Sequence, residues 1–150
     1  IILRWSQWKQ QDYSVSLTNT PEELEAFLQP LSDAGVDIFH CSTRRFWEPA
    51  FEGSDLTLAG WTKKLTGKPA IAVGSVGLDK DYIGSGSADL FDDAELVSLD
   101  NLAERMDKNE FDLVAVGRAL IANPDWANQV QAGKFDDLAA YEKAELAKLV

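Results

Sequence analysis

The sequence predicts an α/β fold with a parallel β-sheet, and three observations support this prediction. Short apolar segments alternate with amphipathic segments, giving the order βαβαβαβα. The four strands are expected to start near Ile1, Val36, Ala70 and Asp112. The intervals between these starts are 35, 34 and 42 residues, close to the length of one βα unit. The last two apolar segments also run directly into glycine, as strands of such folds often do.

The first half of the chain contains two strands and one well-marked helix. Residues 1–8 open as an apolar strand that turns polar. A helix is expected to begin at Thr20, because a capping threonine precedes a proline at the first helical position and glutamates in the first turn. Gly35 follows the last apolar residue of that helix, where a C-cap glycine belongs. Residues 36–42 form the second strand, and a polar and aromatic loop, 43–56, follows it.

The second half repeats this alternation. The elements expected there are a helix over 57–65 that ends at Gly67, a strand over 69–73, a helix over 98–109, a strand over 111–116, and helices over 126–132 and 137–149. The strand 69–73 is apolar throughout, which is typical of a strand buried on both faces. A long loop, 78–96, separates it from the next helix, and the acidic stretch 89–95 is interpreted as solvated, with no metal site expected.

The number of strands narrows the architecture to two alternatives. A (β/α)8 barrel has eight strands and about 250 residues, whereas this chain has 150 residues and four expected strands. The chain is therefore half of a barrel or a small open sheet. Half of a barrel has two exposed strand edges, so an isolated half is expected to form a homo-oligomer or to need its other half.

Composition and charge exclude several classes of protein. A chain of this length is expected to form one domain, residues 1–150. No apolar run reaches the roughly 18 residues that span a bilayer, and residues 1–6 carry an arginine and no cleavable apolar core, so neither a membrane protein nor a signal peptide is expected. The net charge of −11 disfavours nucleic acid and anionic lipid as partners. A cytoplasmic location is expected, because the sequence shows no targeting signal and its single cysteine has no partner for a disulfide.

Candidate functional residues lie where the expected strands end, because active sites of parallel α/β folds lie at the carboxyl ends of the strands. Arg4 lies near the end of the first strand and His40 near the end of the second. The third strand ends in Gly74-Ser75 and the fourth in Gly117-Arg118. Glycine lets a backbone N–H group approach an anion, and arginine can bind two phosphate oxygens. These turns predict a phosphate-bearing ligand; the alternative is that the glycines only make tight turns and Arg118 pairs with an aspartate.

Three segments of the chain resemble the Old Yellow Enzyme family of NADH:flavin oxidoreductases. They are the sequence LRWS at 3–6, AVGS at 72–75 and, most specifically, DLVAVGRALIANPDW at 112–126. The resemblance covers almost the whole chain and implies the C-terminal half of a TIM barrel, strands 5–8, with the N-terminal half absent. It also implies an FMN-dependent ene-reductase, in which reduced FMN passes a hydride to an activated C=C bond such as an enone and NAD(P)H is the reductant.

The same resemblance implies roles for individual residues. Arg4 would contact the N1 and C2 carbonyl edge of the flavin and stabilise the negative charge of the reduced ring, which makes it the catalytic residue of this half. Gly74 and Ser75 would offer backbone N–H groups to the FMN phosphate. Gly117 and Arg118 would complete that phosphate site. His40 is expected to line the barrel, and the aromatic residues of loop 43–56 could equally shape a substrate pocket or form a small core.

Some groups that the family needs are not located in this sequence. The substrate-anchoring pair of the family comes from strand 4 and its proton-donating tyrosine follows nearby, whereas the one histidine here, His40, is on a later strand. The expected partners are therefore a small activated alkene and the N-terminal half of the barrel. Two alternatives stay open: a non-catalytic half-barrel that binds a phosphate ligand, and another FMN or sugar-phosphate TIM-barrel enzyme.

Overall fold

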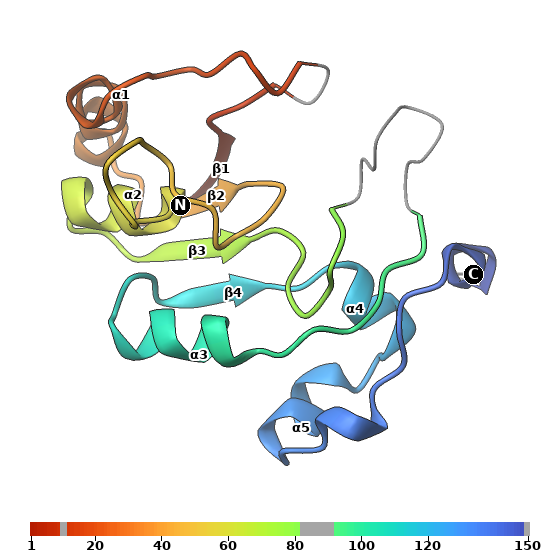
Figure 1. The fold of residues 1–150 in the computed structure, drawn as a ribbon. Helices are drawn as coiled ribbons and strands as arrows, with labels where there is room; N and C mark the ends of the chain where they lie inside the picture. Colours follow the sequence, from red (N-terminus) through yellow and green to blue (C-terminus); the bar gives the residue numbers. More distant parts are fainter. Residues whose placement is uncertain (10–11, 82–91, 149–150) are drawn as a thin grey trace. The chain divides into compact units, whose positions relative to one another are not determined.

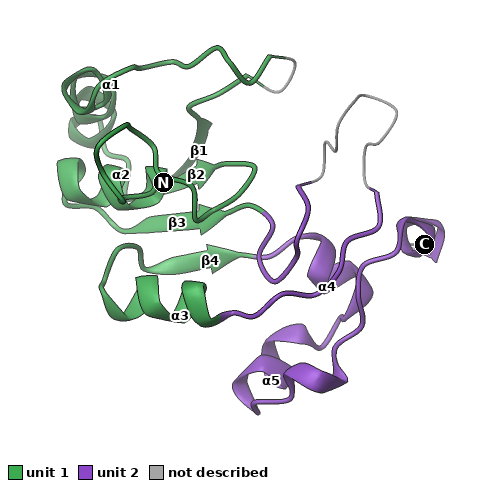
Figure 2. Cartoon of the chain, in the orientation of Figure 1, with its two compact units in different colours: residues 1–74, 100–115 green, residues 75–99, 116–150 purple. Residues whose placement is uncertain are grey.

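The computed structural model describes residues 1–9, 12–81 and 92–148. Most of the expected loop 78–96, the first residues of the acidic stretch 89–95 and the end of the expected helix 137–149 lie outside the described residues. The chain divides into two compact units, which are described separately (Figure 2). Unit 1 comprises residues 1–74 and 100–115, and unit 2 comprises residues 75–99 and 116–150.

Unit 1 contains a four-stranded parallel sheet, as the sequence predicts. The strands are β1 (Ile2–Ser6), β2 (Ile38–Ser42), β3 (Ala70–Val73) and β4 (Leu113–Ala115). Each strand pairs with the next one along the chain, so the order across the sheet is β1-β2-β3-β4. The register aligns Arg4 with His40, His40 with Ile71 and Ile71 with Leu113, and these side chains share one face of the sheet.

The helices that connect the strands lie on the opposite face. Helix α1 (Pro21–Asp33) places Phe27 against Trp5 of β1, with ring centroids 5.4 Å apart. Helix α2 (Leu58–Thr66) places Thr62 against Cys41 of β2. Both helices pack side by side on this face (Figure 1). Sequential strand order with helices on one face is the winding of a barrel, whereas an open doubly wound sheet reverses its strand order. The structure is therefore part of a TIM barrel.

The expected start and stop signals of the first two helices are confirmed. Thr20 is the N-cap of α1 and its hydroxyl accepts a hydrogen bond of 3.2 Å from the Glu23 N–H group. Thr57 caps α2 in the same way through the Gly60 N–H group. Gly67 ends α2 with a φ of +66°, in the left-handed region that glycine adopts without strain. The chain's own capping chemistry thus sets where these helices begin and end.

Unit 2 departs from the expectations in two places. A five-residue helix, α4 (Arg118–Ala122), lies between β4 and α5 (Trp126–Gln131). The sequence pattern did not predict it, because a helix of about one turn is too short to show a periodic pattern. The expected α-helix over 137–149 is wrong. Two 3-10 segments, Phe135–Asp137 and Lys143–Lys148, flank an extended stretch instead.

The extended stretch is held by a side-chain amide and by a bridge. The Asn123 amide donates to the Ala139 carbonyl at 2.9 Å, and the Ala139 N–H group donates back to Asn123 at 2.8 Å. Tyr141 and Ala94 exchange backbone hydrogen bonds in an isolated antiparallel bridge, and the Tyr141 side chain is fully buried. These contacts fix an extended backbone, and they are invisible to helix periodicity.

Helix α3 (Asp100–Asp107) returns to unit 1 and begins two residues later than expected. In the part of the chain that the structure describes, no helix has the length and apolar character that crossing a membrane requires.

Candidate functional site

The strand register brings Arg4 against two polar residues of β2 on the face that the helices leave open. The Arg4 side chain is exposed, and its Nη1 atom lies 2.7 Å from Nε2 of His40. Its Nη2 atom donates to the Ser42 hydroxyl at 3.0 Å. His40 is the register partner of Arg4, and Ser42 lies two residues further along the same face. Arg4 is thus held by two neutral acceptors of the neighbouring strand.

His40 and its neighbour Cys41 lie on opposite faces and have different protonation chemistry. Partial burial, and secondarily the charge of Arg4, lower the pKa of His40, so its imidazole is neutral at pH 7. Burial raises the pKa of the Cys41 thiol to about 12, and the thiol donates to the Thr62 hydroxyl at 3.3 Å. A thiol that is buried and neutral is inert, so Cys41 is a core residue and not a nucleophile.

Gly74, at the end of β3, is needed for packing within unit 1. Its φ is +134°, and a Cβ atom built on it would lie 2.7 Å from the Thr43 carbonyl oxygen and 2.8 Å from the Arg44 backbone. The Gly74 carbonyl also accepts a hydrogen bond of 3.0 Å from the Phe46 N–H group. The loop after β2 therefore packs directly on this glycine, a packing role that neither the phosphate assignment nor the tight-turn alternative includes.

In unit 2, the side chains of Ser75 and Arg118, both assigned from the sequence to a phosphate site, lie close together. The Arg118 Nη2 atom lies 3.5 Å from the Ser75 hydroxyl, and the same guanidinium donates to the carbonyl oxygens of Lys80 and Asp81. Ser75 has a φ of +49°, a backbone conformation that is uncommon for a residue with a side chain. Burial lowers the pKa of Arg118, whose guanidinium lies 5.6 Å from the centre of the Tyr141 ring. This group of residues is called the Arg118 cluster below.

Gly117 differs from Gly74 in its surroundings. It precedes α4 with a φ of −109°, and no atom lies within 4 Å of the position where its Cβ would be. Its carbonyl accepts a hydrogen bond from the Leu120 N–H group at 2.9 Å. The space beside Gly117 is therefore open, as a turn that admits a ligand requires.

The five residues assigned from the sequence thus fall into separate groups. Arg4 and Gly74 belong to unit 1, and Ser75, Gly117 and Arg118 belong to unit 2. The sequence interpretation missed the contact of Arg4 with His40 and Ser42. The spacing of His40 and Ser42, two residues apart on one strand, was the available signal, because it places both on one face.

The aromatic residues of loop 43–56 form a small core. Phe46 is buried and makes edge-to-face contacts with Trp47 and Phe111, at centroid distances of 5.2 and 6.3 Å. Phe51 packs in the same manner on Trp61 of α2, at 5.8 Å. Of the two alternatives for this loop, these contacts favour the small core.

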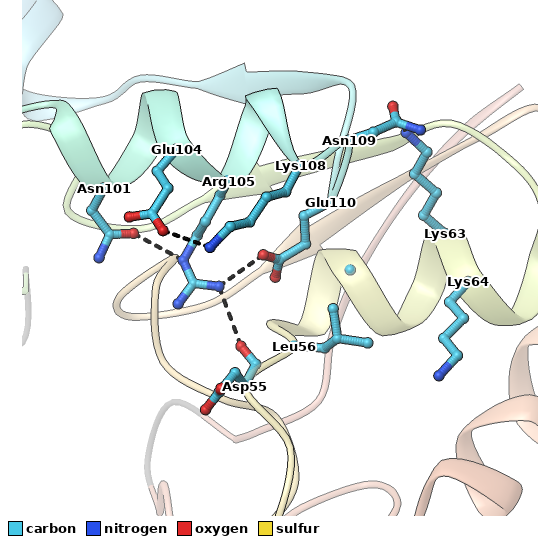
Figure 3. A pocket seen from close by; sticks show the side chains of 11 residues that line it. Asp55, Leu56, Lys63, Lys64, Asn101, Glu104, Arg105, Lys108, Asn109 and Glu110 are labelled. Carbon is cyan, nitrogen blue, oxygen red and sulfur yellow. Dashed lines mark hydrogen bonds and ion pairs between the residues drawn. The ribbon is translucent and has the colours of Figure 1, made fainter.

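A hollow of about 610 Å³ in unit 1 lies between α2 and α3, on the side of the helices (Figure 3). Arg105 spans it, donating to Glu110 and Asn101 at 2.8 Å each and to the Asp55 carbonyl at 3.2 Å. Glu110 is buried and also accepts a hydrogen bond of 2.7 Å from the Thr57 N–H group, at the start of α2. The charged groups at the centre of this hollow, Arg105 and Glu110, are paired with each other. Their further hydrogen bonds connect α3 to the start of α2 and to the loop before α2.

Comparisons with known proteins bear on the fold. No family model matches the sequence, and no curated protein matches it. The structure is similar to morphinone reductase, with a TM-score of 0.55 and 19% sequence identity over 94% of this chain and 30% of that chain. A structure of morphinone reductase in complex with tetrahydroNAD gives a TM-score of 0.57 at 17% identity over the same shares. A variant of NCR from Zymomonas mobilis gives 0.51 at 12% identity, over 92% of this chain and 35% of that chain.

These structures belong to the Old Yellow Enzyme family, which the sequence resembles. At such low identities the likeness establishes the fold, a partial TIM barrel of four parallel strands, as predicted. The chain spans about a third of the length of these proteins. Activity, substrates and partners of the whole proteins are therefore treated below as proposals.

Proposed function

We propose that this chain is part of an FMN-dependent oxidoreductase that reduces activated C=C bonds, such as those of enones, with NAD(P)H as the reductant. The observation that carries the proposal is the oriented Arg4 guanidinium on the open face of a barrel-type sheet. The similarity to morphinone reductase and NCR folds supports the same reaction class.

The chemistry of Arg4 fits the edge of a flavin ring. Flavin, when bound, supplies hydride transfer, and its reduced form carries negative charge near N1. Arg4 remains positively charged, and among the described residues it forms no ion pair with a carboxylate. Its charge is therefore available to an anionic ring, and stabilising that charge favours hydride transfer to the flavin.

The Arg118 cluster has the donors that a phosphate needs. It contains a partly buried guanidinium and the Ser75 hydroxyl, which donates to the Lys80 carbonyl at 2.9 Å, and Gly117 leaves open space beside its backbone. The Tyr141 hydroxyl is buried and has no hydrogen-bond partner among the described residues, so this cluster also contains an unsatisfied donor. A phosphate would compete for Arg118 with the carbonyl oxygens of Lys80 and Asp81.

Gly74 is assigned to the same phosphate site, through its own N–H group and that of Ser75. Its α-carbon packs on the backbone of Thr43 and Arg44, so its substitution tests packing as well as binding. The groups that anchor and protonate the alkene are assigned to a further part of a longer protein, the N-terminal half of the barrel. Residues 1–150 are assigned to one half-barrel domain, for which a cytoplasmic location is proposed.

The proposal is tested by measuring the dissociation constants of FMN and riboflavin, which differ by the phosphate. Replacing Arg118 with alanine is expected to weaken FMN binding by about tenfold or more and to leave riboflavin binding unchanged, because only FMN carries the charged group that Arg118 would bind. Replacing Arg4 with alanine is expected to weaken the binding of both ligands, most strongly in the reduced state. Equal FMN affinity of the wild type and the Arg118→Ala variant would contradict the phosphate assignment.

The same measurement distinguishes a flavin site from a site that binds only a phosphate ligand or a sugar phosphate. A half-barrel that only binds a phosphate ligand, or a sugar-phosphate enzyme, would bind inorganic phosphate or a sugar phosphate through Arg118 and show no affinity for riboflavin. The Ser75–Arg118 contact is the observation that favours this second function, since it would serve any phosphate ester.

A further inference from the structure

The contact between Arg4 and His40 has a defined hydrogen-bond direction. A guanidinium has only donors, so His40 must accept, and the shorter contact, 2.7 Å, is to Nε2. The same Nη1 atom lies farther from the second ring nitrogen, Nδ1, at 3.4 Å, so Nε2 is the nearer acceptor. A protonated imidazole has no acceptor and would repel Arg4. The observed arrangement thus requires neutral His40.

The surroundings of His40 favour the neutral form. Arg4 faces it from β1, Ile71 is its register partner on β3, and Ser42 is its neighbour on the same face of β2. Among these groups only Arg4 is charged, so burial first, and the charge of Arg4 second, disfavour the imidazolium. Arg4 thus contributes to keeping His40 neutral, and neutral His40 can accept a hydrogen bond from Arg4.

The neutral acceptors His40 and Ser42 leave the positive charge of Arg4 available for an anionic ligand. The chain contains 25 Asp and Glu residues, yet the described residues place none of them in an ion pair with Arg4. A carboxylate at this position would orient the guanidinium but cancel most of its charge. An imidazole nitrogen and a hydroxyl orient it and leave the charge in place.

We propose that His40 is a positioning residue for Arg4: in its neutral form it fixes the orientation of the guanidinium toward an anionic ring, and its protonation releases the guanidinium. The identity of the anion as the flavin rests on the proposed function. His40 does not itself contact the reacting atoms in this role. In this role the protonation state of His40, and therefore the pH, determines whether the Arg4 guanidinium is held in place.

The pairing can be tested without any ligand, because His40 is the one histidine of the chain and gives a single imidazole Cε1–H signal in a proton NMR titration. The wild-type pKa is expected to lie below the ordinary value for histidine. Replacing Arg4 with glutamine is expected to raise it, since the neighbouring charge is removed. The Ser42→Ala variant is the matched control, because it removes the other acceptor of Arg4 and leaves the charge. A His40 pKa that is the same in the wild type and the Arg4→Gln variant would overturn the pairing.

The positioning role is tested by two substitutions of His40 that differ in one property. Glutamine keeps an acceptor oxygen that does not titrate, whereas leucine has no acceptor. The His40→Leu variant is expected to bind FMN about tenfold more weakly than the wild type at pH 7.5 and to lower the flavin midpoint potential, and the His40→Gln variant is expected to restore both. Between pH 7.5 and 5.5 the wild type is expected to lose affinity for riboflavin, which has no titrating phosphate, and the His40→Gln variant to retain it, because protonation of His40 removes the acceptor of Arg4.

The outcomes distinguish this proposal from the proposed function. Wild-type FMN affinity and potential in the His40→Leu variant, with thermal melting unchanged, would overturn the positioning role and leave the flavin assignment standing. A wild-type chain that binds no FMN would overturn the flavin assignment for this chain, and positioning toward a flavin would fall with it. The NMR titration would still decide whether Arg4 and His40 pair.

Discussion

The two faces of the sheet in unit 1 are built from alternate residues of the same strands, but they have different environments. On the face covered by α1 and α2, Phe39 and Cys41 have no exposed surface. On the other face, Ile2 is 60% exposed and Leu113 is 49% exposed. Apolar side chains on this face are thus exposed beside Arg4. The core lies on the face that the helices cover, and the exposed face is available for ligands and for the rest of a barrel.

The largest effect is expected from testing this difference in burial. Replacing Phe39 with alanine is expected to lower the free energy of unfolding by about 3–5 kcal/mol, because it removes a ring from a fully packed environment. Replacing Leu113 with alanine on the open face is expected to cost less than about 1 kcal/mol. Chemical denaturation monitored by tryptophan fluorescence measures both. Similar losses in the two variants would mean that the open face is covered in solution, for example by a second copy of the chain.

An intermediate effect is expected where a strand end meets the loop after β2. Replacing Gly74 with alanine is expected to destabilise the chain by about 2–4 kcal/mol, because Ala is strained at a φ of +134° and its Cβ would collide with the Thr43 and Arg44 backbone. The matched control is Gly117→Ala, which meets open space at a negative φ and is expected to cost at most about 1 kcal/mol. Thermal unfolding provides the comparison. Equal melting temperatures of the two variants would show that the loop does not pack on Gly74.

The smallest expected effect is a difference in chemical reactivity between two adjacent residues, Cys41 and His40, which lie on opposite faces of the sheet. Iodoacetamide is expected to leave Cys41 unmodified at pH 8 in the folded chain, because the thiol is buried and its pKa is raised to about 12. Diethylpyrocarbonate is expected to modify His40, whose ring is neutral and partly accessible on the open face. Mass spectrometry of the intact chain detects both products. Rapid alkylation of Cys41 before unfolding would contradict the burial of this face.

The sequence by itself determined the order and kind of the main elements of unit 1. The periodicity, the capping residues Thr20 and Thr57, and Gly67 act within a few residues of one another, so their effects can be recognised in a linear string. The parallel sheet followed from the βα spacing. The sequence also assigned Ser75 and Arg118 to one phosphate site through the family resemblance, and the structure adds their side-chain contact.

Tertiary structure decided the features that depend on distant residues. Arg4 meets His40 and Ser42 only because β1 and β2 pair in one register, and a shift by one residue would place them on opposite faces. The tail is extended because Asn123 binds Ala139 across 16 residues, a contact that outweighs local helical preference. The requirement for Gly74 comes from a loop some thirty residues earlier. Local chemistry thus chose the elements, and long-range packing decided which side chains meet.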